Sequence, residues 1–296
     1  MAKASAVSKR KGKPPLRIVS RMIGGHLAHW YECDGVSQSG RGVTTILGNG
    51  LPAPALIKWT GNTVADCALD EGDIWRPLAQ RDRAAAYDYL RNAADRDRDQ
   101  AANRGTEVHG YAERMANGEE VEPPDELLGH VDAYIEWAEL WQPEIVAVEM
   151  VGANWTHRYF GRFDLLVKVK GWWAEDTPKD ALLLVDIKTS RSGPFPKDAL
   201  QLTAYRHFEQ VAVPDDDGNC WDLEPMPEVD GCCVLQLAAG SHQFVPVNPD
   251  LDRALFAQFL HTLRTAEFLG SGWGAKKTGW DQDSLLPARL EPHQPF

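Results

Sequence analysis

Hydrophobic positions in the middle of the chain fall into two short runs that predict a β-hairpin. Residues 163–169 and 181–187 are mostly apolar and contain several β-branched side chains, a composition that favours strands. The intervening residues 171–180 contain Gly, Pro, Asp and Lys, which are typical of turns. Side chains alternate between the two faces of a strand, so Asp186 and Lys188 should share one face while Ile187 takes the other.

Helical periodicity and further apolar runs surround this hairpin. The pattern predicts helices over residues 54–69, 77–102, 106–117, 125–141, 195–211 and 251–269, and strands over 26–33, 145–151, 232–238 and 243–247. The buried stripe of the helix over 125–141 should contain Leu128, Val131, Ile135 and either Ala138 or Trp137, and Asp250 should cap the last helix. We therefore expect an α/β fold with a central mixed sheet flanked by helices.

The predicted hairpin carries the first candidate chemistry. It can bring Asp164 beside Asp186, with Lys188 close to both. Two close carboxylates repel one another, so one must be protonated or a cation must lie between them. Oxygen ligands suit Mg²⁺ or Mn²⁺, and the lysine could contact a phosphate oxygen or orient a water. A bare D-x-K is common by chance, and its plain alternative is a surface hairpin with one ion pair.

Three further motifs accompany D-x-K, in a fixed order along the chain. Gly105-Thr106 precedes His109 in a GT-x-x-H pattern, Gly161 opens G-x-x-D, and Q-x-x-x-Y follows the hairpin. Gln201 and Tyr205 of this last motif lie four residues apart and share one helix face. The ordered set, within residues 42–208, resembles the PD-(D/E)XK nuclease superfamily. Within it, the chain looks like the RecB-like exonucleases, a branch with phage-encoded and CRISPR-associated members.

The resemblance implies a restriction-endonuclease-like core and metal-dependent hydrolysis of phosphodiester bonds at DNA ends. Asp164 and Asp186 would bind Mg²⁺ or Mn²⁺, with His109 and the Ile187 backbone carbonyl as further ligands. Lys188 would complete the catalytic set by orienting water and offsetting charge. Family members use the residues equivalent to Gln201 and Tyr205 to support the strand and contact DNA.

Glu149 is a further candidate with two interpretations. In the predicted strand over 145–151 it could approach the metal as an additional acid. It could instead pair with Arg158 or Arg162, which lie shortly downstream. The sequence leaves both interpretations open.

Charge and composition divide the chain into three parts. The net charge is −12, which argues against coating of nucleic acid by bulk charge, although local contacts to DNA remain compatible with it. Basic residues gather at the N-terminus, so we predict a disordered basic tail over 1–18, either a solubilising segment or an arm on DNA phosphates. The nuclease domain, with a helical N-terminal portion, should span 19–270, and an irregular tail 271–296. Arginines of the segment 77–102 should form a solvated face or a DNA-facing stripe.

Five cysteines and the absence of a long apolar run bear on cofactor and location. Some RecB-like nucleases hold an iron–sulfur cluster through a C-x-x-C group, which this sequence lacks, so we expect no cluster. No apolar run reaches a membrane span, and we expect a cytoplasmic protein, in the bacterial host if phage-encoded. Besides linear DNA, the family association suggests a single-strand annealing or recombination protein as a partner. Two alternatives remain: a non-catalytic DNA-binding or assembly protein on the same fold, and a PD-(D/E)XK endonuclease.

Overall fold

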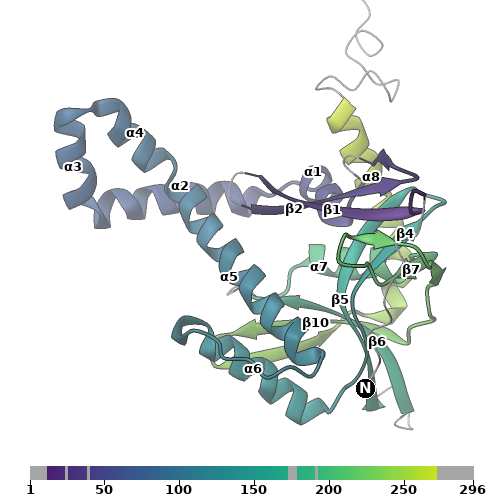
Figure 1. The fold of residues 1–296 in the computed structure, drawn as a ribbon. Coiled ribbons are helices and arrows are strands. Elements are labelled where there is room, and N and C mark those ends of the chain that lie inside the picture. The colour runs from purple at the N-terminus through teal and green to yellow at the C-terminus, as the bar shows by residue number, and fades with distance from the viewer. Residues whose placement is uncertain (1–11, 24–25, 39–40, 173–178, 191–192, 272–296) are drawn as a thin grey trace, which may run out of the picture.

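The computed structural model describes residues 12–23, 26–38, 41–172, 179–190 and 193–271. Two β-sheets and a set of helices make up this part of the chain (Figure 1). The predicted tails lie largely outside it, apart from residues 12–18 and the last residue of the final helix.

A mixed seven-stranded sheet forms the centre, in the order β11-β10-β6-β5-β4-β7-β9. Strands β6 and β10 run parallel, and the other neighbours are antiparallel. The predicted hairpin is confirmed as β5 and β6. The strands are β4 (Glu144–Asn154), β5 (Tyr159–Trp172), β6 (Lys179–Lys188), β7 (Gln210–Ala212), β9 (Glu224–Pro225), β10 (Gly231–Ala238) and β11 (Ser241–Pro246).

A second, four-stranded sheet contains the N-terminal strands. It comprises β1 (Leu16–Ile23), β2 (His26–Cys33), β3 (Val36–Ser37) and β8 (Asn219–Cys220), in the order β3-β2-β1-β8. The predicted strand over 26–33 is confirmed as β2. Strand β1 was not predicted, and it includes the last three residues of the tail proposed for 1–18. Leu16 and Ile18 are buried because they pack in one apolar cluster with Tyr31 and Phe160, and Phe160 belongs to the central sheet.

Helices cover both faces of the central sheet, which makes the fold α/β. Strand residues of one face pack with α5 and α6, and those of the other with α1, α7 and α8. In Figure 1, α2, α3 and α4 extend away from the sheets as a helical arm. None of the described helices is long and apolar enough to cross a bilayer. The helices are α1 (Val43–Gly50), α2 (Pro54–Asp70), α3 (Gly72–Arg81), α4 (Arg83–Arg91), α5 (Ala93–Ala116), α6 (Asp125–Trp141), α7 (Pro196–Arg206), the 3₁₀ helix η1 (Pro249–Leu251) and α8 (Asp252–Ser271).

The prediction of one long helix over 77–102 is wrong. The chain turns at Asp82, whose carboxylate accepts a hydrogen bond from the backbone N–H of Ala85 and so caps α4, and it turns again at Asn92. Pro77 lies inside α3 rather than at a helix start. The helix predicted over 106–117 is the second half of α5, so Gly105 lies within a continuous helix. Asp at an N-cap was the available signal for the first break.

Three finer predictions also need correction. Helix α6 buries Val131 and Trp137 as expected, but Leu128 and Ile135 are 41% and 42% exposed, because the rest of its buried stripe is formed by Leu127, Ala133 and Tyr134. The helix after residue 195 ends at Arg206, and residues 210–212 form β7 instead. The last helical segment is capped by Asn248, whose side chain accepts a hydrogen bond from the backbone N–H of Asp250.

Two glycines let α7 and the segment after it pack directly on the central sheet. A Cβ atom on Gly161 of β5 would lie 2.5 Å from Cε1 of Tyr205, and one on Gly152 of β4 would lie 2.0 Å from Cδ2 of Phe208. Real Cβ atoms do not approach this closely. The Gly of G-x-x-D therefore makes room for the Tyr of Q-x-x-x-Y.

Replacing Gly161 with Ala tests this packing. The added methyl group must displace the buried Tyr205 ring, so Gly161→Ala should lower the free energy of unfolding by ~1–3 kcal/mol. Gly48→Ala is the matched control, because Gly48 lies in α1 and a Cβ atom there would meet nothing within 4 Å, and it should gain ~0.5–1 kcal/mol. Urea unfolding of the two variants measures both changes. Equal stability of Gly161→Ala and the wild type would contradict the packing argument.

Candidate active site

The site lies where β5 and β6 separate. Leu165 pairs with Val185 at the last register position before the fork. Beyond it, β5 continues to pair with β4, while β6 pairs with β10 as far as Lys188. The Asp164 carboxylate bridges the fork by accepting a hydrogen bond from the backbone N–H of Ile187, with an N–O distance of 2.6 Å. A backbone donor that has lost its strand partner is thereby satisfied by a side chain.

Asp186 and Lys188 point to the same face of β6, as predicted, and contact one another. The Lys188 Nζ atom lies 2.5 Å from an Asp186 carboxylate oxygen. Gln201 of α7 donates to the other Asp186 oxygen at 2.9 Å and accepts from Lys188 at 3.3 Å. The same amide nitrogen also donates to the Tyr205 hydroxyl at 3.0 Å. One glutamine thus fixes the relative positions of the acid, the lysine and the tyrosine.

Helix α7 is held in place at its first turn. Pro196 occupies the first helical position, and the Asp198 carboxylate accepts a hydrogen bond from the backbone N–H of Phe195 at 2.7 Å. These features fix where the helix begins. Gln201 and Tyr205, one turn apart on the buried side, then face β6 and β5.

His109 reaches the fork from α5. Its Nδ1 atom lies 3.4 Å from an Asp164 carboxylate oxygen. One turn earlier, a Cβ atom on Gly105 would lie 3.1 Å from the Thr189 hydroxyl oxygen, directly after Lys188. The glycine therefore lets α5 approach the end of β6, and this approach explains the G and the H of GT-x-x-H.

Glu149 lies next to the same carboxylate. It forms an ion pair with the Nε atom of Arg162, and a donor atom from each of His109, Glu149 and Asp164 lies within 4.8 Å of the others. Of the two interpretations left open by the sequence, the ion pair with Arg162 is confirmed; a role of Glu149 as an additional acid for a metal stays a prediction, although Glu149 lies beside Asp164. Arg158 is not its partner among the ion pairs of the described residues.

Burial and charge shift the titration of these groups in different directions. Burial raises the pKa of Asp186 to about 6, despite the nearby Lys188 ammonium. Burial alone would also raise the pKa of Asp164, but His109 and Lys188 outweigh it and hold that pKa below its usual value. Burial and the Asp164 charge raise the pKa of Glu149 to about 7. The two aspartates of the fork are thus unequal, with Asp164 the more readily ionised.

Three possible metal ligands lie close together in the site. One imidazole nitrogen and two carboxylate oxygens, from His109, Glu149 and Asp164, lie within 4.8 Å of one another. The carboxylates suit Mg²⁺ or Mn²⁺, whereas an imidazole ligand is more typical of transition metals. Asp186 is not one of these three residues; its oxygens contact Lys188 and Gln201, and its predicted role as a metal ligand stays a prediction. The predicted participation of the Ile187 carbonyl stays a prediction.

Sequence reasoning missed what lies behind the site. Tyr31 of β2 stacks on Phe160 of β5, with ring centroids 5.7 Å apart. The Tyr31 hydroxyl is close enough to Arg162 and Glu149 to interact electrostatically with both. Nothing in the local sequence of β2 signals this neighbourhood, because it depends on packing between the two sheets.

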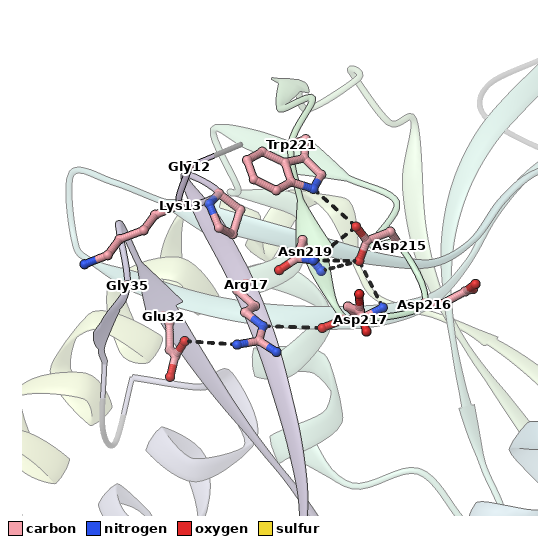
Figure 2. A pocket seen from close by; sticks show the side chains of 11 residues that line it. Gly12, Lys13, Arg17, Glu32, Gly35, Asp215, Asp216, Asp217, Asn219 and Trp221 are labelled. Carbon is pink, nitrogen blue, oxygen red and sulfur yellow. Dashed lines mark hydrogen bonds and ion pairs between the residues drawn. The ribbon is translucent and has the colours of Figure 1, made fainter. Parts of the chain in front are cut away.

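A surface pocket of ≈ 780 Å³ lies elsewhere, between the N-terminal strands and the loop before β8. Figure 2 shows two networks among its lining residues. In the first, Arg17 contacts Glu32 at 3.8 Å and the Asp217 carbonyl at 3.4 Å. The Asp215 carboxylate accepts hydrogen bonds from Asn219 and from the Trp221 indole. The residues lining the pocket include none of the predicted site residues.

The titration of His109 gives a test without substrate. Burial alone would lower the pKa of this imidazole, but Asp164 outweighs burial and raises the pKa from 6.5 to about 8, which corresponds to about 2 kcal/mol. A raised folded-state pKa contributes stability that is fully present below 6.5 and is lost as pH rises through 8. The test compares the unfolding free energies of wild type and His109→Gln in EDTA. The difference between the two proteins should be larger at about pH 6 than at about pH 9, by about 2 kcal/mol. Urea titrations of both proteins measure the difference, and a pH-independent gap would separate His109 from Asp164.

Comparisons with known proteins leave the family open. No protein-family model matches the chain, and no curated protein matches it. Among solved structures, the chain is similar to one titled "Crystal structure of SSO0001", with 16% identity over 57% of this chain and 73% of the other. The TM-score is 0.26, which supports no conclusion about fold family or activity. The comparisons therefore leave the PD-(D/E)XK resemblance as a prediction from the motifs.

Proposed function

We propose that this chain is a Mg²⁺- or Mn²⁺-dependent deoxyribonuclease with a restriction-endonuclease-like core that hydrolyses phosphodiester bonds at DNA ends. The observation that carries the proposal is the network in which Gln201 holds both Asp186 and Lys188 beside the fork occupied by Asp164. Four motifs far apart in the sequence meet in it or next to it. Recombination, replication or repair of phage DNA is the setting that the motif resemblance suggests.

In this proposal, each residue of the fork has a different role in hydrolysis. A divalent cation bound there would act as a Lewis acid on the phosphate and lower the pKa of water. Asp164, the more readily ionised acid, would hold the cation together with His109. Lys188 would face the scissile phosphate and offset the negative charge that grows in the transition state. Gln201 would keep the lysine in that orientation.

Charge balance favours an anionic substrate once a metal is present. Glu149, Asp164 and Asp186 face three basic groups, Arg162, His109 and Lys188. These groups are formally neutral together when all are ionised. An imidazole must be neutral to bind a metal ion. Binding of a divalent cation would therefore release the His109 proton and add two positive charges, which leaves a net charge of about +1 on the site. The local field then attracts phosphate although the chain as a whole is acidic.

Two alternatives predict different experimental results. A non-catalytic DNA-binding protein on this fold would bind DNA and leave it intact with every metal. An endonuclease would cut closed circular DNA, whereas an exonuclease requires an end. End-labelled linear duplex and covalently closed circles, each with Mg²⁺, Mn²⁺ or EDTA, separate the three functions.

Lys188→Ala tests the assignment of the chemistry. The substitution keeps the carboxylates but removes one preorganised positive charge, so cleavage of linear DNA should fall by about 100-fold to 1,000-fold. DNA affinity, measured in Ca²⁺ to suppress turnover, should change far less because it is spread over many contacts. Single-turnover rates and affinities should come from the same preparation.

Lys168→Ala provides the matched control. Lys168 lies on β5 and pairs with the exposed Glu144 at 3.2 Å, so its removal should leave the cleavage rate unchanged. Equal rates for Lys188→Ala and wild type would mean that the chemistry lies elsewhere or comes from a contaminant.

A further inference from the structure

Asp198 is a buried acid of α7 on the same side of the helix as Gln201 and Tyr205. It precedes these two residues by one and two helical turns, so the three side chains lie along one face. All three are buried, with exposed fractions of 2% for Asp198, 8% for Gln201 and 2% for Tyr205. Since Gln201 contacts both Asp186 and Lys188, this face of α7 lies against the end of β6.

The two carboxylate oxygens of Asp198 have different surroundings. Its Oδ2 atom accepts a hydrogen bond from the backbone N–H of Phe195 at 2.7 Å and so caps α7. Its Oδ1 atom is buried and has no hydrogen-bond partner among the described residues. A buried carboxylate oxygen without a donor is costly, so capping of the helix explains only one half of this side chain.

Lys188 has a donor left for a further partner. An ammonium group carries three N–H donors, and the contacts with Asp186 at 2.5 Å and with Gln201 at 3.3 Å account for two of them. The neighbouring strand offers no acid at this position, because Gln236 of β10 pairs in register with Lys188 and donates its amide N–H to the Ser190 carbonyl at 2.7 Å. A second acidic partner for the ammonium is therefore to be sought on α7.

Charge connects Asp198 with this lysine. Burial alone would lower the pKa of Lys188, but the charges of Asp186, Asp164 and, to a smaller extent, Asp198 outweigh burial and raise that pKa above its ordinary value. Asp186 and Asp164 belong to the strands of the fork, whereas Asp198 acts from α7. The ammonium group thus interacts with acids of the sheet and with an acid of the helix packed on it.

We propose that Asp198 is a positioning residue for Lys188: one carboxylate oxygen caps α7, and the other holds the Lys188 ammonium toward that helix. Its effect on catalysis rests on the proposed function, in which Lys188 faces the scissile phosphate. A reacting group that is displaced by about 1 Å can lose much of its effect on the rate, so a lysine held from two elements is better placed than one held by β6 alone. The competing explanation is a plain helix cap, which requires the hydrogen bond from Phe195 but no charge.

Asp198→Asn separates the two explanations through the cleavage rate. The asparagine oxygen still accepts the hydrogen bond from Phe195, so a plain cap predicts the wild-type rate. If Asp198 positions Lys188, the single-turnover rate on linear DNA should fall by about 10-fold, and Asp198→Glu, which keeps both the cap and the charge, should restore most of it. Loss of a negative charge by itself favours an approaching phosphate, so a fall in rate does not follow from the general field. A wild-type rate for Asp198→Asn would overturn the proposal.

A double-mutant cycle tests the interaction without DNA or metal. Wild type, Asp198→Asn, Lys188→Met and the double variant are unfolded with urea in EDTA, and the coupling between the two sites is taken from their unfolding equilibrium constants. The proposal predicts a coupling factor of at least about 5-fold, because each charge stabilises the other. Asp82→Asn is the matched control: Asp82 also caps a helix, by accepting a hydrogen bond from the backbone N–H of Ala85. Its effect should be additive with Lys188→Met, and it should leave the cleavage rate unchanged.

The two proposals fail in different ways. Additive unfolding effects of Asp198→Asn and Lys188→Met would overturn the role of Asp198, whether or not the chain cleaves DNA. Coupling in the cycle, combined with no cleavage by the wild type in Mg²⁺ or Mn²⁺, would overturn the nuclease proposal and still support the interaction between Asp198 and Lys188. Circular dichroism checks the fold of each variant. If Asp198→Asn does not fold, Asp198→Ser takes its place in both measurements, because a serine hydroxyl can also accept the capping hydrogen bond.

Discussion

Repulsion among neighbouring carboxylates is the constraint around which this molecule is built. Glu149, Asp164 and Asp186 lie on the adjacent strands β4, β5 and β6 and form a row of neighbouring acids, in which the charge of Asp164 acts on both of the others. Each of the three is largely removed from water. A sheet tolerates such a row where compensating charges or a cation accompany it. Here each acid has a basic neighbour drawn from β5, α5 or β6. The packing of the surrounding elements places these three bases, His109, Arg162 and Lys188, beside the acids.

The separation of β5 and β6 gives those groups access to the row. While two strands stay paired, their side chains stand perpendicular to the sheet and their backbone groups are engaged. At the fork, β6 loses its pairing with β5 but stays paired with β10 on its other edge, and the Ile187 N–H donates to the Asp164 carboxylate instead. The same opening admits His109 from one side and Gln201 from the other. A single local event, the loss of one strand pairing, thus creates both the space and the polar contacts of the site.

Close approach of helices to strands then fixes the distances. Gly161 and Gly152 let α7 and Phe208 lie directly against the sheet, and Gly105 lets α5 pass the end of β6. In each case a side chain at the glycine would meet an atom of the partner element. These glycines explain why the residues that carry chemistry are accompanied by glycine in their motifs: helix and strand must approach closely before the polar side chains can meet.

Local patterns in the sequence determined a good part of this arrangement. Alternation along residues 181–188 is enough to set Asp186 and Lys188 on one face, and helical spacing is enough to set Gln201 and Tyr205 on one face, because both depend on backbone periodicity alone. The hairpin, β2, β10, β11 and most helices also follow from apolar patterns and turn residues. The breaks at Asp82 and Asn92, by contrast, lie within a continuous helical composition, in which only the N-cap preference of Asp82 signals the first break.

Tertiary structure alone decided which groups meet. The contact of His109 with Asp164 depends on how α5 crosses the sheet, and the place of Glu149 beside Asp164 depends on the register of β4. The choice of Arg162 over Arg158 as the partner of Glu149 likewise follows from strand pairing, since both arginines are close in sequence. The N-terminal strands border the site because Leu16, Ile18 and Tyr31 find their apolar partners on β5 and its neighbours. Periodicity specifies which residues share a face within one element, whereas distances between elements arise from packing. Almost all contacts of this site are contacts between elements.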